Sequence, residues 1–367
     1  MKIERIKLAT KFTMGMFILI LVTMIITYVI NPNLENLLNG VSTNVPETSN
    51  SNQGLNQILS YVINNGVRVP FQMFILSLIP IGYLYLTNAI ITSILTGILF
   101  GALFRYSIAK SIAFLCSAFP YENVKAILTT IGGLNCNELL PYIDWNLIKQ
   151  NPKMFIGYSD TTSLHNAIRA KTGLVTYYGP SYSSFKMDEL QEFQTQSWIK
   201  AMKNKNYKLE PSDLWTSDLW FDKSITRSPQ KTKWKIYNHG EVKGVITGGN
   251  IQTYNLQAGT KFLPEVESPI LFLELSEGGI PLEFSRYLAQ ILEIHTDVSG
   301  LVIGRFPTDT EISEEILYYI LDKFPILKTI PVIYDVDFGH TQPIFTFPLG
   351  GIAEISTDPM VIQISQG

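Results

Sequence analysis

A short apolar stretch at residues 154–156 ends at Gly157-Tyr158-Ser159-Asp160, which lead into two threonines. This order predicts a strand that turns sharply into a helix. Such a turn exposes a serine hydroxyl beside the amides of a helix start, as in several hydrolases. Thr161 stands where the usual Gly-x-Ser-x-Gly motif has its second glycine. Because Ser-Asp-Thr is also a good N-cap, a plain helix start is the alternative interpretation.

Two more apolar stretches that end in glycine flank this turn. Val124–Thr130 runs into Ile131-Gly132-Gly133, and Leu174–Tyr178 runs into Gly179-Pro180. Helical spacing at 135–145 and 161–171 separates the three strands, which predicts parallel pairing with right-handed crossovers. Ligands of such sheets bind beyond the carboxyl ends of the strands, where these glycines and Ser159 would meet.

The C-terminal part reads as a second α/β domain that begins near residue 240. Helices are expected at 281–294 and 311–323. The segment before it, 186–240, is looser and contains Trp215, Trp220 and Trp234. Strands are expected at 242–247, 270–275, 301–303, 330–334 and 351–355.

The N-terminal third carries two uncharged apolar blocks, 12–30 and 69–104. Their lengths predict transmembrane helices at about 12–30, 69–86 and 88–104, and hence a multi-pass membrane protein. A signal peptide and a buried helical hairpin are the alternatives. Basic residues before the first span place the N-terminus in the cytoplasm, so three spans would put the rest outside. Arg105 and Lys110, after the last span, instead slightly favour the cytoplasmic side for the rest of the chain.

Charge divides the chain in the same way. Residues 1–120 carry seven Lys/Arg against three acids, a balance of +4, and the whole chain carries −3, which leaves −7 for residues 121–367. That acidic part has no basic stripe, so we expect no nucleic-acid partner. Two cysteines, Cys116 and Cys136, define neither a disulfide framework nor a metal site.

A serine nucleophile needs a base, and His340 is the best-placed histidine. It lies in Asp337-Phe338-Gly339-His340-Thr341, directly after a predicted strand. The other three histidines are expected to be structural, capping or at the surface: His165, His239 and His295.

The base needs an orienting carboxylate, and Glu274 closes the apolar strand at 270–273. A carboxylate at the end of a buried stretch is costly unless it has a partner, and a histidine is a natural one. Two alternatives stay open: Glu274 faces solvent, or Glu277 or Glu283 is the acid instead. The amide of Asp160 and one from Gly132 or Gly133 could form an oxyanion hole. Asn250, after another Gly-Gly pair, could bind substrate or simply form a turn.

From about residue 118 the chain resembles the LD-carboxypeptidase family of serine peptidases, and most closely its microcin C self-immunity (MccF-like) branch. Several motifs occur in the family's order over this part of the chain. They are Val124-Lys125-Ala126-Ile127-Leu128-Thr129-Thr130-Ile131-Gly132-Gly133, Gly157-Tyr158-Ser159-Asp160, Thr176-Tyr177-Tyr178-Gly179-Pro180, Gly248-Gly249-Asn250, Leu271-Phe272-Leu273-Glu274, Gly304-Arg305-Phe306, Asp337-Phe338-Gly339-His340-Thr341 and Pro348-Leu349-Gly350.

The resemblance implies a triad of Ser159 as nucleophile, His340 as base and Glu274 as its orienter, with no metal and no cofactor. Typical members cleave an L,D bond in peptidoglycan stem peptides. The MccF-like branch cleaves an aminoacyl group from a nucleotide-like toxin, and loop tryptophans stack on the nucleobase there. Trp215 and Trp220 lie in the corresponding region, with core packing as the alternative. A homodimer is compatible with the resemblance.

The chain departs from the family ahead of the Gly132-Gly133 strand, where members carry about a hundred residues of α/β domain. We therefore expect an α/β fold with a truncated parallel-sheet nucleophile domain, a second α/β domain and an N-terminal transmembrane region. The expected divisions are 1–117 (membrane), 118–185 (nucleophile domain remnant), 186–240 (connection) and 241–367 (C-terminal domain with Glu274 and His340). An inactive, hydrolase-derived membrane protein is the alternative function.

Overall fold

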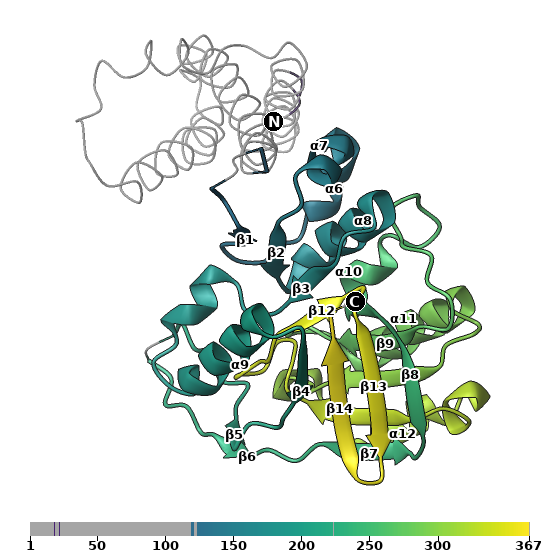
Figure 1. The fold of residues 1–367 in the computed structure, drawn as a ribbon. Helices are drawn as coiled ribbons and strands as arrows, with labels where there is room; N and C mark the ends of the chain where they lie inside the picture. The colour runs from purple at the N-terminus through teal and green to yellow at the C-terminus, as the bar shows by residue number, and fades with distance from the viewer. Residues whose placement is uncertain (1–17, 19–21, 23–118, 121–122, 223, 367) are drawn as a thin grey trace, which may run out of the picture. The chain divides into compact units, whose positions relative to one another are not determined.

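The computed structural model describes residues 18, 22, 119–120, 123–222 and 224–366. The chain divides into two compact units, Met1–Phe114 and Leu115–Gly367. All described residues except Ile18 and Val22 belong to the second unit, which contains all the described strands (Figure 1).

The smaller sheet has four strands in the order β1-β2-β3-β12. The parallel strands are β1 (Ala126–Leu128), β2 (Met154–Gly157) and β3 (Thr176–Tyr178). The fourth, β12 (Phe347–Leu349), pairs antiparallel with β3 and comes from the far end of the chain (Figure 1). The sheet that carries Ser159 is therefore extended by a strand that we did not expect.

The larger sheet has eight strands in the order β4-β14-β13-β8-β9-β10-β11-β7. Its centre is parallel: β8 (Glu241–Asn250), β9 (Ile270–Glu274), β10 (Gly300–Gly304) and β11 (Val332–Val336). The flanking strands are antiparallel: β4 (Asn206–Leu209), β14 (Met360–Ser365), β13 (Ile352–Thr357) and β7 (Lys235–Asn238). A separate pair joins β5 (Leu214–Trp215) and β6 (Gln230–Lys231).

Short helical elements connect the strands of the first half. They are α6 (Cys136–Leu139), η4 (Leu140–Tyr142), α7 (Trp145–Gln150), η5 (Ser159–Thr161), α8 (Thr162–Thr172), η6 (Tyr182–Lys186) and α9 (Gln191–Lys203). In the second half they are α10 (Ile251–Asn255), α11 (Pro281–Ile294), η7 (Thr308–Thr310), α12 (Glu314–Leu321) and η8 (Pro325–Lys328).

Three apolar clusters hold these layers together. One joins the two sheets, with Tyr178 and Phe347 of the smaller packed against Phe272 of the larger. A second lies between the larger sheet and α10, α11 and α12. The third packs β1 and β2 against α7 and α8. Central parallel strands covered on both faces are apolar throughout, which is why 270–274 reads as a continuous apolar stretch before its glutamate.

Two expected elements differ from the structure. The helix expected at 135–145 is split, because Pro141 has no N–H for a helical hydrogen bond and Asp144 caps a new helix. The Asp144 carboxylate accepts hydrogen bonds from the amides of Asn146 and Leu147, each at 3.0 Å. The segment 186–240 is also more ordered than expected, since it supplies α9 and two strands of the larger sheet.

The expected transmembrane spans at 12–30, 69–86 and 88–104 fall outside the described residues, apart from Ile18 and Val22. Among the residues that the structure describes, no helix combines the length and apolarity needed to cross a bilayer. This finding contradicts two predictions. The fold class loses its N-terminal transmembrane region, and the multi-pass membrane location is withdrawn. The described fold is mixed α/β, with a four-stranded sheet, an eight-stranded sheet and the separate β5-β6 pair.

Candidate active site

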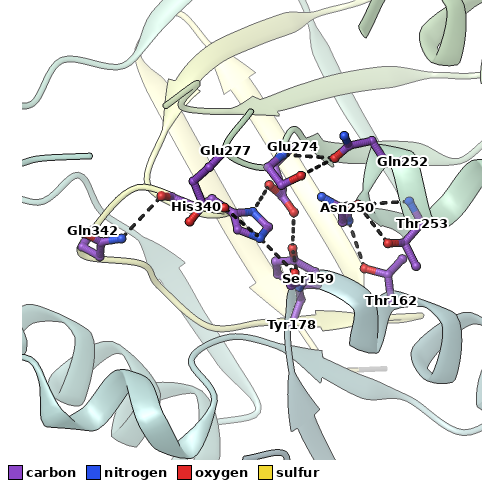
Figure 2. Close-up of polar contacts among 11 residues, drawn as sticks. Ser159, Thr162, Tyr178, Asn250, Gln252, Thr253, Glu274, Glu277, His340 and Gln342 are labelled. Carbon is purple, nitrogen blue, oxygen red and sulfur yellow. Dashed lines mark hydrogen bonds and ion pairs between the residues drawn. The ribbon is translucent and has the colours of Figure 1, made fainter. Parts of the chain in front are cut away.

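Ser159 stands at the turn between β2 and α8, as the sequence predicted. Its φ is +62°, a left-handed conformation that costs a non-glycine residue about 1–3 kcal/mol. The amide of Thr161 donates to the Tyr158 carbonyl at 3.2 Å, which closes the turn. From this turn the Ser159 side chain reaches toward His340 (Figure 2).

The side chains of Ser159, His340 and Glu274 form one chain of hydrogen bonds (Figure 2). The Ser159 Oγ lies 2.9 Å from His340 Nε2, and His340 Nδ1 lies 2.7 Å from Glu274 Oε2. Gly339 makes this approach possible. It has a φ of +101°, and a Cβ there would lie 2.7 Å from Glu274 Oε2.

Glu274, at the end of β9, is fully buried, and His340 is 7% exposed. Burial by itself lowers the pKa of the imidazole, but the carboxylates of Glu274, Glu277 and Asp309 outweigh it and raise the His340 pKa above 6.5. Of the alternative acids, Glu277 lies at the rim with Oε2 3.8 Å from His340 Nε2, and Glu283 is in the first turn of α11.

Tyr178 is a member of this cluster that the sequence did not reveal. Its hydroxyl donates to Glu274 Oε1 at 2.6 Å and accepts from the amide of Ser159 at 3.3 Å. The side chain is fully buried, and burial beside Glu274 raises its pKa well above 10. Tyr178 lies in a stretch that matched the family pattern, but nothing local distinguishes it from a core tyrosine such as Tyr207.

The glycine pair after β1 lies against the serine turn. A Cβ on Gly132 would lie 2.8 Å from Ser159 Cβ, 2.9 Å from its Oγ and 3.6 Å from the Asp160 amide nitrogen. A Cβ on Gly133 would lie 3.2 Å from Asp160 Oδ2, which also accepts from the Cys136 amide at 2.9 Å. The structure thus brings Gly132, Gly133 and Asp160 together at Ser159.

Asn250 lies at the end of β8, opposite Glu274 in the strand register. Its Oδ1 caps α10 by accepting from the Thr253 amide at 3.0 Å, and its own amide donates to Thr162 Oγ1 at 3.0 Å (Figure 2). The side chain is 3% exposed, and within the described residues its Nδ2 has no hydrogen-bond partner. A buried amide group that lacks a protein partner is suited to bind a ligand.

The two candidate tryptophans lie in different surroundings. Trp220 lines a small pocket together with Tyr158 and Gly339, next to His340. Trp215 instead packs under Arg305, whose guanidinium carbon is 4.6 Å from the ring centroid, and lines another pocket with Pro307 and Glu314. Trp220 thus shares a pocket with Tyr158, whose ring centroid lies 5.3 Å from that of His340, whereas Trp215 does not; neither Ser159 nor His340 lines either pocket.

The remaining histidines make structural contacts. His165 is buried, which lowers its pKa to about 4, and its Nε2 lies 3.0 Å from the carbonyl of Gly157. His295 lies 2.6 Å from the Tyr254 hydroxyl, and His239 lies 3.3 Å from Thr357 Oγ1. In the described ranges no three His, Cys, Asp or Glu side chains are grouped as metal ligands would be.

Comparison with known proteins agrees with the resemblance seen in the sequence. The LD-carboxypeptidase N-terminal domain profile matches residues 99–179, and the C-terminal domain profile matches 243–355. A putative carboxypeptidase of Treponema pallidum is 37% identical, over 70% of this chain and 77% of that protein.

Solved structures give the same result. An MccF-like protein from Bacillus anthracis is 41% identical, with a TM-score of 0.68 over 71% of this chain and 82% of the other. MccF in complex with glutamyl sulfamoyl guanosine is 31% identical, with a TM-score of 0.64 over 71% of this chain and 81% of the other.

The N-terminal profile begins at residue 99, inside the segment expected to form the last transmembrane span, which further corrects the membrane prediction. Both domain profiles match in order, and the T. pallidum relative is matched over more than two thirds of its length. The chain therefore belongs to the LD-carboxypeptidase family and is MccF-like.

Proposed function

We propose that this protein is a serine hydrolase in which Ser159 is the nucleophile, His340 the general base and Glu274 the residue that orients the imidazole. The observation that carries the proposal is the pair of short contacts of His340, 2.9 Å to Ser159 Oγ and 2.7 Å to Glu274 Oε2. Nucleophile, base and orienter at these distances suit acyl transfer.

The reaction would proceed in two steps. Ser159 Oγ attacks the acyl carbon while its proton passes to His340 Nε2, and the buried carboxylate of Glu274 stabilises the imidazolium. His340 then gives this proton to the leaving nitrogen, which breaks the amide bond and leaves an acyl-serine. Water attacks the ester with His340 again as base, which releases the acid and restores Ser159.

The oxyanion that forms in each step needs amide donors. The Ser159 amide is already bonded to the Tyr178 hydroxyl, which leaves Asp160 and the Gly132-Gly133 segment beside the serine as the proposed donors. The buried Nδ2 of Asn250 is proposed to bind the acyl part of the substrate.

We propose an aminoacyl-nucleotide-type compound as the substrate, cleaved at the amide that joins the aminoacyl group to a sulfamoyl or phosphoramidate nucleotide. Support comes from the relative MccF, which is known in complex with glutamyl sulfamoyl guanosine. Trp220, at the pocket beside His340, is proposed to contact the nucleotide, and Trp215 is a weaker proposal because Arg305 covers one face of its ring.

A second candidate is cleavage of an L,D amide bond in peptidoglycan stem peptides. The family to which both domains belong is described as LD-carboxypeptidase, which favours this reaction class. The domain divisions 118–185, 186–240 and 241–367 and a homodimer also stay proposals. Limited proteolysis and light scattering test them.

The function is tested by incubating the full chain with an aminoacyl-sulfamoyl adenosine and, separately, with an L,D-tetrapeptide. Free amino acid is measured by mass spectrometry for the wild type and for Ser159→Ala, with Ser163→Ala as a matched control. Ser163 is a buried serine four residues further along, in the first turn of α8, whereas Ser159 is partly exposed.

We expect the wild type and Ser163→Ala to hydrolyse one of the two substrates, and Ser159→Ala to lose the activity. The substrate that is turned over decides between the two candidates. Equal turnover by Ser159→Ala would remove Ser159 from the mechanism. No turnover of either substrate by the wild type would favour a hydrolase-derived domain without activity.

A further inference from the structure

We propose that Tyr178 is a positioning residue that couples the acid of the triad to the backbone of the nucleophile. The proposal rests on the proposed function of Ser159, His340 and Glu274. Its basis is that one buried hydroxyl contacts both ends of the triad, Glu274 Oε1 at 2.6 Å and the Ser159 amide at 3.3 Å (Figure 2).

The two oxygens of Glu274 have different partners. Oε2 accepts from His340 Nδ1 and Oε1 accepts from Tyr178, so the carboxylate is held at both ends and cannot rotate about its Cγ–Cδ bond without losing a bond. Because Glu274 is fully buried, a lost donor is not replaced by bulk water. Tyr178 thereby fixes the orientation that the carboxylate presents to His340.

The second contact acts on the serine turn. Ser159 has a φ of +62°, so its amide points away from the helical hydrogen-bond pattern and needs another acceptor. The Tyr178 hydroxyl is that acceptor, and it can accept because its own proton is directed at Glu274. The polarity of the bonds is therefore set in one direction, from the Ser159 amide through Tyr178 to the carboxylate.

The ring itself cannot move freely. Tyr178 is in β3, its ring packs against Phe338 and Phe347 at centroid distances of 6.2 and 5.3 Å, and a Cβ on Gly249 would lie 3.2 Å from its Cε2. Phe338 is two residues before His340, so the same ring also supports the segment that carries the base.

Removal of the hydroxyl has two consequences that a purely structural residue would not produce. The buried anion loses a donor, so the Glu274–His340 pair holds its proton more tightly, and the pH at which His340 becomes a free base rises. The other charged or titratable groups that face the imidazole, Glu277, Asp309 and Tyr158, are unchanged. The Ser159 amide also loses its acceptor, so the nucleophile is held less well.

The test uses a fluorophosphonate probe, which needs no knowledge of the natural substrate. Ser159 Oγ bonds to phosphorus, fluoride leaves with the P–F electron pair, and the serine proton passes to His340. The labelling rate of the full chain is measured by intact mass from pH 5 to 9. The variants are Tyr178→Phe, Ser159→Ala, and Tyr207→Phe as matched control, since Tyr207 is 5% exposed and its hydroxyl donates to the Thr346 carbonyl at 3.0 Å.

We expect Tyr178→Phe to label roughly 10- to 100-fold more slowly, with the acid limb moved to higher pH, and Tyr207→Phe to match the wild type. If Tyr178→Phe is labelled at the wild-type rate with the wild-type pH dependence, and Ser159→Ala is not labelled, the role of Tyr178 is overturned and the triad stays intact. Labelling of Ser159→Ala at the wild-type rate would overturn both proposals.

A second variant keeps the test decisive if Tyr178→Phe does not fold. Tyr178→4-aminophenylalanine places an N–H donor where the hydroxyl was, in a ring of the same size. Because a donor to Glu274 is retained, we expect labelling to be slowed by less than the roughly 10- to 100-fold expected of Tyr178→Phe. The pH at which labelling falls off on the acid side should stay near that of the wild type. A folded aminophenylalanine variant with a limb far above the wild type would contradict the proposal.

Discussion

Replacement of Gly132 by alanine tests how closely the glycine pair must approach the nucleophile. The new Cβ would lie 2.8 Å from Ser159 Cβ and 2.9 Å from its Oγ, whereas carbon contacts are normally about 3.5–4.0 Å. The two segments must therefore separate by up to about 1 Å. A misplacement of about 1 Å at a reacting group can cost about 100-fold in rate.

We expect Gly132→Ala to lower the rate of Ser159 labelling by a fluorophosphonate about 10- to 100-fold. Overpacking should also lower the free energy of unfolding by about 1–3 kcal/mol. Gly173→Ala is the matched control. Its φ of +75° predicts a cost of about 1–2 kcal/mol, but nothing lies within 4 Å of the new Cβ.

Urea unfolding and labelling of both variants separate stability from reactivity. The reasoning requires Gly173→Ala to lose stability and keep its labelling rate, while Gly132→Ala loses both. Wild-type labelling by Gly132→Ala would refute it, because Ser159 would then tolerate displacement of the turn beside it.

Three further outcomes are expected. Glu274→Gln should lower kcat about 10⁴-fold, because an amide stabilises neither the reactive tautomer nor the imidazolium form of His340. An almost unchanged kcat would contradict the role of Glu274. Activity should rise with pH as His340 loses its proton, with a pKa above 6.5. Glu277→Gln should shift this rise to lower pH, because it removes a carboxylate 3.8 Å from His340 Nε2. A rise at the same or a higher pH in Glu277→Gln would contradict this. Arg305→Met should cost about 3–5 kcal/mol in urea unfolding, because it leaves the buried carboxylate of Asp337 without its 2.8 Å partner, and a cost below about 1 kcal/mol would contradict this.

The serine turn and its partners were predictable because their chemistry is local or costly. A strand that ends at Gly-x-Ser can be read from a few residues, and a glutamate at the end of a buried strand requires a partner. His340 was preferred among the four histidines because it follows an expected strand in a glycine-containing turn; His239, in Asn238-His239-Gly240, also follows a strand, β7, but that strand was not expected from the sequence. These arguments need no knowledge of distant contacts.

Other features depend on contacts that no local pattern encodes. Phe347–Leu349 could have extended either sheet, and only packing against Tyr178 and Phe272 selects the smaller one. The double role of Tyr178 depends on Glu274, 96 positions away in sequence. The membrane prediction was wrong for a different reason. It treated the length and lack of charge of two blocks as sufficient evidence for transmembrane helices, but the family's N-terminal domain begins within one of these blocks.

The antiparallel strand β12 has a consequence for biosynthesis. The sheet that carries the nucleophile is finished by residues 347–349, and the base lies 181 positions after the serine. While the ribosome is still translating the middle of the message, the nascent polypeptide holds a serine turn with an open sheet edge and no imidazole beside it. Contacts of such long sequence separation form slowly, so hydrolytic competence would arise only after residues 340–349 have been synthesised and have packed.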